Sequence, residues 1–190
     1  MTSDTYLINE EMLKDYSVMS RNVGIDKIIP FINLAQPMEI ETILGDALAE
    51  ELKLQISNGN ITETNKALLV KIAPALALWT DFYALRSLAW TVTQKGVTKE
   101  KSENSEALNK EELAYFQESI RENAETATEL LIKYLCKCQE EYPLWKPQDD
   151  CICSKYNNEN TGSNKKPVTS LIYFPNKPQK GCGCNERLQN

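Results

Sequence analysis

The sequence contains no histidine. Histidine is the side chain that most often serves as a general base near neutral pH, so its absence excludes every Ser/His and Cys/His nucleophile pair. The acidic pairs are adjacent in sequence, and neighbours on a helix point about 100° apart, so we interpret them as solvated faces and not as paired catalytic carboxylates. These pairs are Glu10/Glu11, Glu50/Glu51, Glu111/Glu112 and Asp149/Asp150. A glycine-rich phosphate loop is also missing, and we therefore expect no enzymatic activity.

Long apolar runs and an excess of positive charge are absent as well. The longest apolar run, Ile72–Trp79, is far shorter than the roughly 20 residues of a membrane span. The opening Met1-Thr2-Ser3-Asp4 lacks the basic and apolar regions of a secretory signal. Because 27 acidic residues outnumber 21 basic ones, we do not expect nucleic-acid binding to be the main function. DNA could still pass along an acidic protein surface without binding to it, since negative charge repels the phosphate backbone. We expect a protein made in the cytoplasm and used there, or in a particle assembled there, without contact to a membrane.

Apolar residues recur at spacings of three and four along much of the chain, which predicts amphipathic helices. These stretches span residues 25–35, 40–56, 67–91 and 110–138. Pro37 is expected to interrupt the backbone hydrogen-bond ladder between the first two stretches, and Gly59 to end the second. Thr62 is the expected N-cap of the third stretch, in which Pro74 could cause a kink. The aromatic residues Trp79, Phe82, Tyr83 and Trp90 have helical spacing and are interpreted as core and not as a ligand box.

The expected fold class is mostly α, a bundle of three to four long helices with a long inter-helix loop and an extended C-terminal tail. Residues 1–20 form an N-terminal arm in which Asn9 caps a brief helix, and residues 21–147 form the helical domain. Residues 148–190 form the extended, cysteine-containing tail. Within this tail, Val168–Phe174 is the only convincing strand in the sequence, and a lone strand must pair with something, a neighbouring subunit being one candidate.

The loop predicted at residues 93–109 is much longer than the usual connection of about 4–6 residues, so it is either disordered or present for contact. Lys95, Lys99 and Lys101 alternate there with acidic residues. This mixture suits a protein partner better than a phosphate.

The six cysteines form three Cys-x-Cys pairs, which leaves several interpretations open. Cys151, Cys153, Cys182 and Cys184 could supply four thiolates to a tetrahedral zinc ion. However, structural zinc sites usually separate paired cysteines by two or more residues, so the signal is weak and no cofactor is expected. The alternatives are reduced cysteines without a site, or disulfides that form late in a mature particle. Cys136 follows an apolar position and is assigned to the core.

Several motifs occur in an order that resembles one known family. An apolar helix is followed by Ala35-Gln36 and by an apolar run that contains Ile43-Leu44-Gly45. The segment Leu69–Trp79, the loop Lys95–Glu106 and a long closing helix come next. Over about residues 5–145, this order resembles the small helical head-to-tail connector proteins of tailed phages, particularly those of crAss-like phages. The tail after Pro147 lies outside the resemblance.

The resemblance implies a structural virion protein, found at the neck between head and tail after assembly in the host cytoplasm. Its partners would be the portal protein, further copies of itself in a homo-oligomeric ring, expected to be a dodecamer, and the next neck or tail ring. DNA would pass through the lumen during genome ejection without specific binding. The expected interface residues are Lys95, Gly96, Val97, Lys99, Ser102, Glu103, Asn104, Val168, Leu171, Ile172, Tyr173 and Phe174. The alternative is a soluble interaction or regulatory protein that binds metal through its cysteine-rich tail.

Overall fold

The computed structural model describes residues 5–88, 90–93, 96–99, 110–147 and 153. The described chain is mostly α-helical, as predicted. Its helices are α1 (Glu10–Tyr16), α2 (Ile25–Ala35), the π-helical η1 (Gln36–Glu41), α3 (Thr42–Leu44), α4 (Asp46–Asn58), α5 (Glu63–Leu88), α6 (Lys110–Lys137) and the 3-10 helix η2 (Gln139–Glu141). Two strands, β1 (Trp90–Thr93) and β2 (Gly96–Lys99), lie between α5 and α6.

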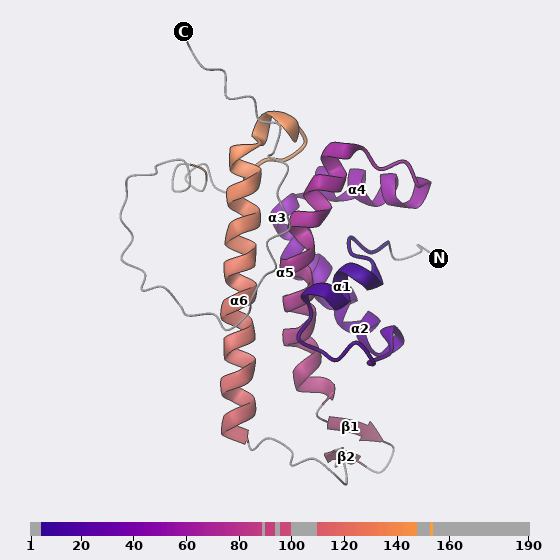
Figure 1. Cartoon of the computed structure of the whole chain (residues 1–190), viewed down its shortest axis with the longest axis vertical. Coiled ribbons are helices and arrows are strands. Elements are labelled where there is room, and N and C mark those ends of the chain that lie inside the picture. Colours follow the sequence, from indigo (N-terminus) through magenta and orange to yellow (C-terminus); the bar gives the residue numbers. More distant parts are fainter. Residues whose placement is uncertain (1–4, 89, 94–95, 100–109, 148–152, 154–190) are drawn as a thin grey trace, which may run out of the picture.

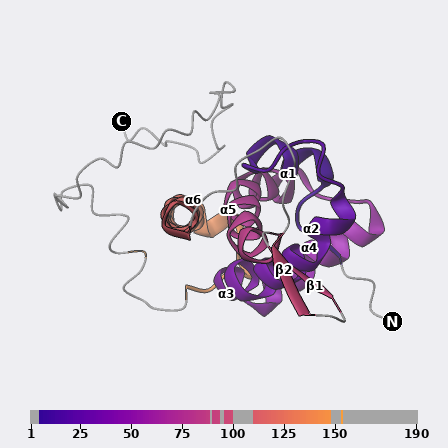
Figure 2. The ribbon, with the colours of Figure 1, turned by 90° about the horizontal axis from the view of Figure 1, so that it is seen from below.

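Helix α5 is the centre of the fold. It lies antiparallel beside α6, while α1 and α2 pack on its other side (Figure 1). The view along the helix axes separates α6 on one side from the N-terminal helices on the other (Figure 2). From Ile72 to Thr80 only Pro74 on α5 is more than slightly exposed, because neighbours cover the helix from both sides.

Helix α5 is also long and apolar enough over Glu63–Leu85 to satisfy the length and composition of a membrane span. Core helices satisfy the same test, and most of this segment is buried within the described fold. Its apolar side chains form the centre of the helical core of the described fold.

The predicted caps are present at three helix ends. The side chain of Asn9 accepts a hydrogen bond from Met12 N at 2.8 Å, and Thr62 Oγ1 accepts one from Asn65 N at 3.2 Å. Gly59 ends α4 with a φ of 67°, in the left-handed region that favours glycine. These local signals therefore determine where the helices begin and end.

Gly45 divides what the apolar pattern predicts as one helix over residues 40–56. Its φ of 74° and ψ of 156° end α3 and start α4 in a new direction. A side chain at this backbone conformation would be strained, although the space around the position is open. The prediction of one uninterrupted helix is therefore wrong at Gly45.

Proline changes the backbone ladder without stopping the helices. Pro37 lies in the first turn of η1, where the wider π-helical turn connects α2 to α3. Thr42 Oγ1 donates to the carbonyl oxygens of Pro37 and Met38 at 3.1 and 3.0 Å. Pro74 lies inside α5, which continues from Glu63 to Leu88. The predicted interruption at Pro37 is thus a local change of hydrogen-bond pattern.

A β-hairpin replaces the predicted end of the third helix and the start of the predicted loop. β1 pairs antiparallel with β2, from Trp90 opposite Lys99 to Thr93 opposite Gly96. Thr91, Val92 and Thr93 are β-branched and favour a strand over a helix. The prediction that Val168–Phe174 is the only strand is therefore wrong, and Val168–Phe174 itself lies outside the described residues.

Helix α6 occupies the predicted range, but its buried face is shorter than predicted. The face is buried from Ile120 to Leu135, whereas Phe116 is 40% exposed and Leu113 is half-buried. Their spacing of three and four residues up to Ile120 predicts both residues on the buried side of this helix. Because α5 ends at Leu88, the first turns of α6 have less of α5 to pack against.

Candidate functional site

The hairpin and the first turns of α6 lie at the same end of the molecule, away from α4 and η2 (Figure 1). Among the predicted interface residues, Gly96, Val97 and Lys99 lie in β2. The others lie outside the described residues: Lys95, Ser102, Glu103, Asn104, Val168, Leu171, Ile172, Tyr173 and Phe174.

Among the described residues, the hairpin leaves strand edges open. In the described part of the chain, the sheet has two strands, so each has one edge without a strand partner. A two-stranded hairpin is only marginally stable unless something else packs on it. Open strand edges are also templates for pairing with another chain.

Two aromatic side chains of α6 are exposed at this end. Tyr115 is 80% exposed and Phe116 is 40% exposed. Tyr115 is not on the apolar stripe of α6, so the periodicity of the sequence did not identify it. Exposed aromatic side chains are enriched at protein interfaces, since each contributes a large contact area at low entropic cost.

The outer face of α6 is acidic. Its exposed residues include Glu111, Glu112, Glu118, Glu122, Glu125 and Glu129. Arg121 forms ion pairs with Glu118 at 2.9 Å and with Glu125 at 3.5 Å, which leaves an excess of negative charge. Such a face repels phosphates.

The N-terminal arm is fastened to the body by the buried amide of Gln36. Its Oε1 accepts a hydrogen bond from Leu7 N at 2.8 Å, and its Nε2 donates to Thr5 O at 3.0 Å and to Glu41 Oε1 at 2.8 Å. Glu41 continues the network to Lys53 at 3.3 Å. Sequence periodicity had not identified this contact, because Gln36 and Leu7 are 29 residues apart.

Buried Asp81 holds the other end of the arm. This carboxylate on α5 is fully buried and accepts hydrogen bonds from Ser17 Oγ and Val18 N, both at 2.7 Å. Burial raises the pKa of Asp81 to about 6, although the two hydrogen bonds oppose the shift. A single Asp within an apolar helix is the sequence signal that could have indicated this buried contact.

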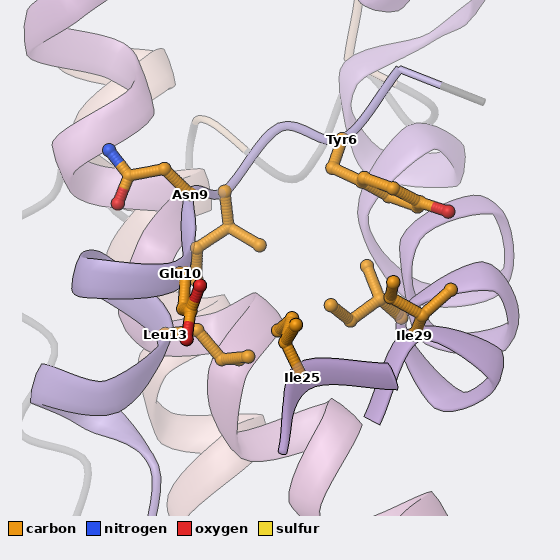
Figure 3. A pocket seen from close by; sticks show the side chains of 8 residues that line it. Tyr6, Asn9, Glu10, Leu13, Ile25 and Ile29 are labelled. Atoms are coloured by element: carbon orange, nitrogen blue, oxygen red, sulfur yellow. The ribbon is translucent and has the colours of Figure 1, made fainter. Parts of the chain in front are cut away.

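A pocket of about 190 Å³ lies between the arm and α2 (Figure 3). Apolar side chains form most of its wall, including Leu13, Ile25 and Ile29, and Tyr6 also faces it. The complete lining is Tyr6, Ile8, Asn9, Glu10, Leu13, Ile25, Ile29 and Ile32. An apolar cavity of about 150 Å³ holds benzene, so this pocket has room for one ring-sized apolar group.

Of the aromatic residues predicted as core, Trp79 is buried and Phe82 and Tyr83 are half-buried on α5, whereas Trp90 lies in strand β1 and not on the helix. Trp79 is 8% exposed and makes an edge contact with Phe82 at 5.6 Å between ring centroids. The indole Nε1 of Trp79 donates to Thr128 Oγ1 of α6 at 3.0 Å. Burial, followed by the nearby carboxylate of Glu39, raises the pKa of Tyr83 to about 12. The cluster thus connects α5 to both α6 and η1.

The segment after α6 is fixed to the opposite end of the body. Tyr142 OH donates to Thr64 O at 2.9 Å, and Trp145 Nε1 donates to Ile43 O at 2.9 Å. Both side chains are buried.

Cys136 near the end of α6 is disulfide-bonded to Cys153, and their Cα atoms are 5.2 Å apart. Cys153 belongs to the predicted zinc set, whose other members, Cys151, Cys182 and Cys184, lie outside the described residues. Within the described part of the chain, no group of three or more Cys, Asp or Glu residues could hold a metal ion. The arrangement at Cys153 favours the disulfide alternative for that residue.

The architecture defines a small, mostly α-helical protein built on an antiparallel helix pair. Comparison of the sequence with family models identifies the family of the chain. The chain belongs to the family of unknown function DUF6712, whose model matches residues 40–155. The match runs from η1 through α5, the hairpin and α6 to just beyond Cys153. No curated protein and no solved structure matches the chain.

Proposed function

We propose that the chain is a structural subunit of the ring that joins the portal of a tailed phage to its neck and tail. Two observations at one end of the molecule support this proposal. The hairpin has open strand edges, and the first turns of α6 expose Tyr115 and Phe116. A second copy or a neck protein that packs against this end would complete both features.

The expected ring geometry is consistent with such an end. Contacts around a closed ring are heterologous, so the surface that offers strand edges differs from the surface that receives them. Gly96, Val97 and Lys99 of β2 would take part in one such contact, as the resemblance implies. The role of Val168–Phe174 as a second contact segment is part of the same proposal.

The acidic outer face of α6 supports the further proposal that DNA passes the ring without specific binding. The exposed glutamates of α6 outnumber its exposed basic residues, so this face would repel the phosphate backbone. The ring would act in the virion after assembly in the host cytoplasm. Neither catalysis nor a cofactor has a part in this proposed function.

The experiment measures the mass of complexes that the full-length chain forms alone and with the portal protein. Mass photometry and negative-stain microscopy should reveal a ring on the portal. Replacing both Tyr115 and Phe116 with Ser should prevent ring formation. Because Tyr115 is 80% exposed and Phe116 is 40% exposed, the single chain should still unfold cooperatively, with a modest loss of stability from Phe116.

Leu130→Ser provides the matched control, since Leu130 is also on α6, is 63% exposed and lies about four turns along the helix from Tyr115 and Phe116. The control variant should form rings like the unmodified chain. A chain that never forms a ring with the portal, or a Tyr115/Phe116 variant that assembles normally, contradicts the proposal.

A further inference from the structure

The disulfide between Cys136 and Cys153 closes a short loop at the end of the helical body. The two cysteines are 17 residues apart in sequence. Between them, Tyr142 and Trp145 are already fixed to the body by their hydrogen bonds to Thr64 and Ile43. The bond therefore adds a third attachment, beyond Pro147, where the chain enters its C-terminal tail.

The two sulfur-bearing side chains differ in accessibility. Cys136 is 5% exposed and belongs to the apolar core. Cys153 is half-buried and packs against the edge of that core. An external thiolate can therefore reach Cys153 more readily than Cys136, and access is one of the factors that decides which sulfur is attacked.

We propose that the Cys136–Cys153 disulfide is a reversible redox clasp for the C-terminal tail, and that Cys153 is the sulfur through which small thiols open and close it. Opening releases Cys153 from Cys136 of α6, while the Tyr142 and Trp145 contacts keep the preceding segment in place. The inference does not depend on the proposed function.

A low-molecular-weight monothiol serves as the reductant that opens the disulfide. Its thiolate attacks the sulfur of Cys153, forms a mixed disulfide there and releases Cys136 as a thiolate, which takes up a proton. A second thiol attacks the mixed disulfide, which releases Cys153 as a thiol and the small molecule as its symmetric disulfide. Closure reverses these steps, with the small disulfide as oxidant and two thiols of the monothiol as products.

The test uses the full-length chain equilibrated in glutathione buffers from fully reduced to fully oxidised. Free thiols are alkylated in acid-quenched samples, and tryptic peptides are analysed by mass spectrometry. Cleavage after Lys137 separates Cys136 from Cys138, so Cys136 is identified by its own peptide. Cys138, Cys151 and Cys153 stay together in the peptide 138–155, because trypsin does not cleave before Pro147, and fragment-ion spectra assign the modified cysteine within it. We expect a Cys136–Cys153 crosslink in oxidising buffer, and glutathione on Cys153 in at least about tenfold excess over Cys136 at intermediate ratios.

Two serine variants make the test specific. Cys153→Ser should abolish the crosslink and give protease access beyond Pro147 even in oxidising buffer, whereas Cys151→Ser should retain the crosslink and its protection. Reduction of the unmodified chain should expose the same cleavage sites as Cys153→Ser. Three results would each overturn the inference. These are crosslinks only among other cysteines, glutathione mainly on Cys136, or proteolysis that does not change with the redox buffer.

Discussion

Trp145 donates its indole N–H to the backbone carbonyl of Ile43 at 2.9 Å, a contact that joins residues 102 positions apart. Trp145 is 3% exposed, so water has little access to this carbonyl if the donor is lost. The bond fixes the chain that follows α6 to the α3 segment. It belongs to the part of the chain that the family model matches.

Replacing Trp145 with Phe should destabilise the fold. Phe retains most of the apolar contact but leaves the carbonyl of Ile43 without its donor, which costs about 1–3 kcal/mol. Urea denaturation followed by circular dichroism measures this change. Leu144→Ala is the control, because Leu144 is 45% exposed and its truncation should change the unfolding free energy by less than about 0.5 kcal/mol. Equal effects of the two variants would contradict the assigned role of Trp145.

Replacing Gln36 with Glu should detach the N-terminal arm. A carboxylate cannot donate to Thr5 O, and it would also lie beside the carboxylate of Glu41. Hydrogen exchange should show loss of protection at the Leu7 amide, while the amides of α5 remain protected. Asn33→Asp on the exposed face of α2 introduces the same charge without the contact. Because a carboxylate can still accept from Leu7 N, Gln36→Met, which removes both the acceptor and the donor, is measured beside it. Retained protection at Leu7 in both variants would rule out this anchoring contact.

Replacing Asp81 with Asn should change how stability depends on pH. The folded pKa of Asp81, about 6, lies above its ordinary value of 3.8, so the folded chain binds this proton more tightly than the unfolded chain. The cost of burying the charge is therefore absent below about pH 4 and complete above about pH 6, where it reaches about 3 kcal/mol.

The Asp81→Asn variant should consequently gain stability relative to the unmodified chain as the pH rises from 4 to 7. Urea denaturation at several pH values measures this difference. The altered hydrogen bonds to Ser17 and Val18 can also lower the unfolding free energy of the variant. This loss is the same at every pH, so it shifts the stability curve of the variant without changing its slope. Parallel stability curves over this pH range would mean that Asp81 does not titrate as described.

Replacing Gly45 with Ala should cost about 1–2 kcal/mol, because a side chain is strained at a φ of 74°. Gly24→Ala is the matched control, since Gly24 has a φ of −64° and both positions have open space around them. Thermal unfolding distinguishes the two variants. A similar melting temperature for both would show that the backbone at Gly45 can relax.

Local signals in the sequence predicted most of the helical framework. The caps at Asn9 and Thr62 and the stop at Gly59 each act within one turn of a helix, so neighbouring residues are sufficient to identify them. The hairpin was missed because Trp90 and Val92 extend the apolar composition of α5, and composition alone does not reveal a change from helix to strand.

The contacts that fix the arm could not be predicted in the same way. The bonds of Gln36 to Leu7 and of Asp81 to Ser17 depend on segments far apart in sequence meeting in space. Likewise, the apolar stripe of α6 identified a buried face but not where α5 stops covering it, so Phe116 was assigned to the core although it is 40% exposed.

If a tailed phage encodes the chain, as the proposed function requires, the most direct test is quantitative mass spectrometry of purified virions of that phage. The account predicts that the protein is present at the copy number of one ring per particle, relative to the portal protein. Particles that join head to tail while lacking this protein would contradict it.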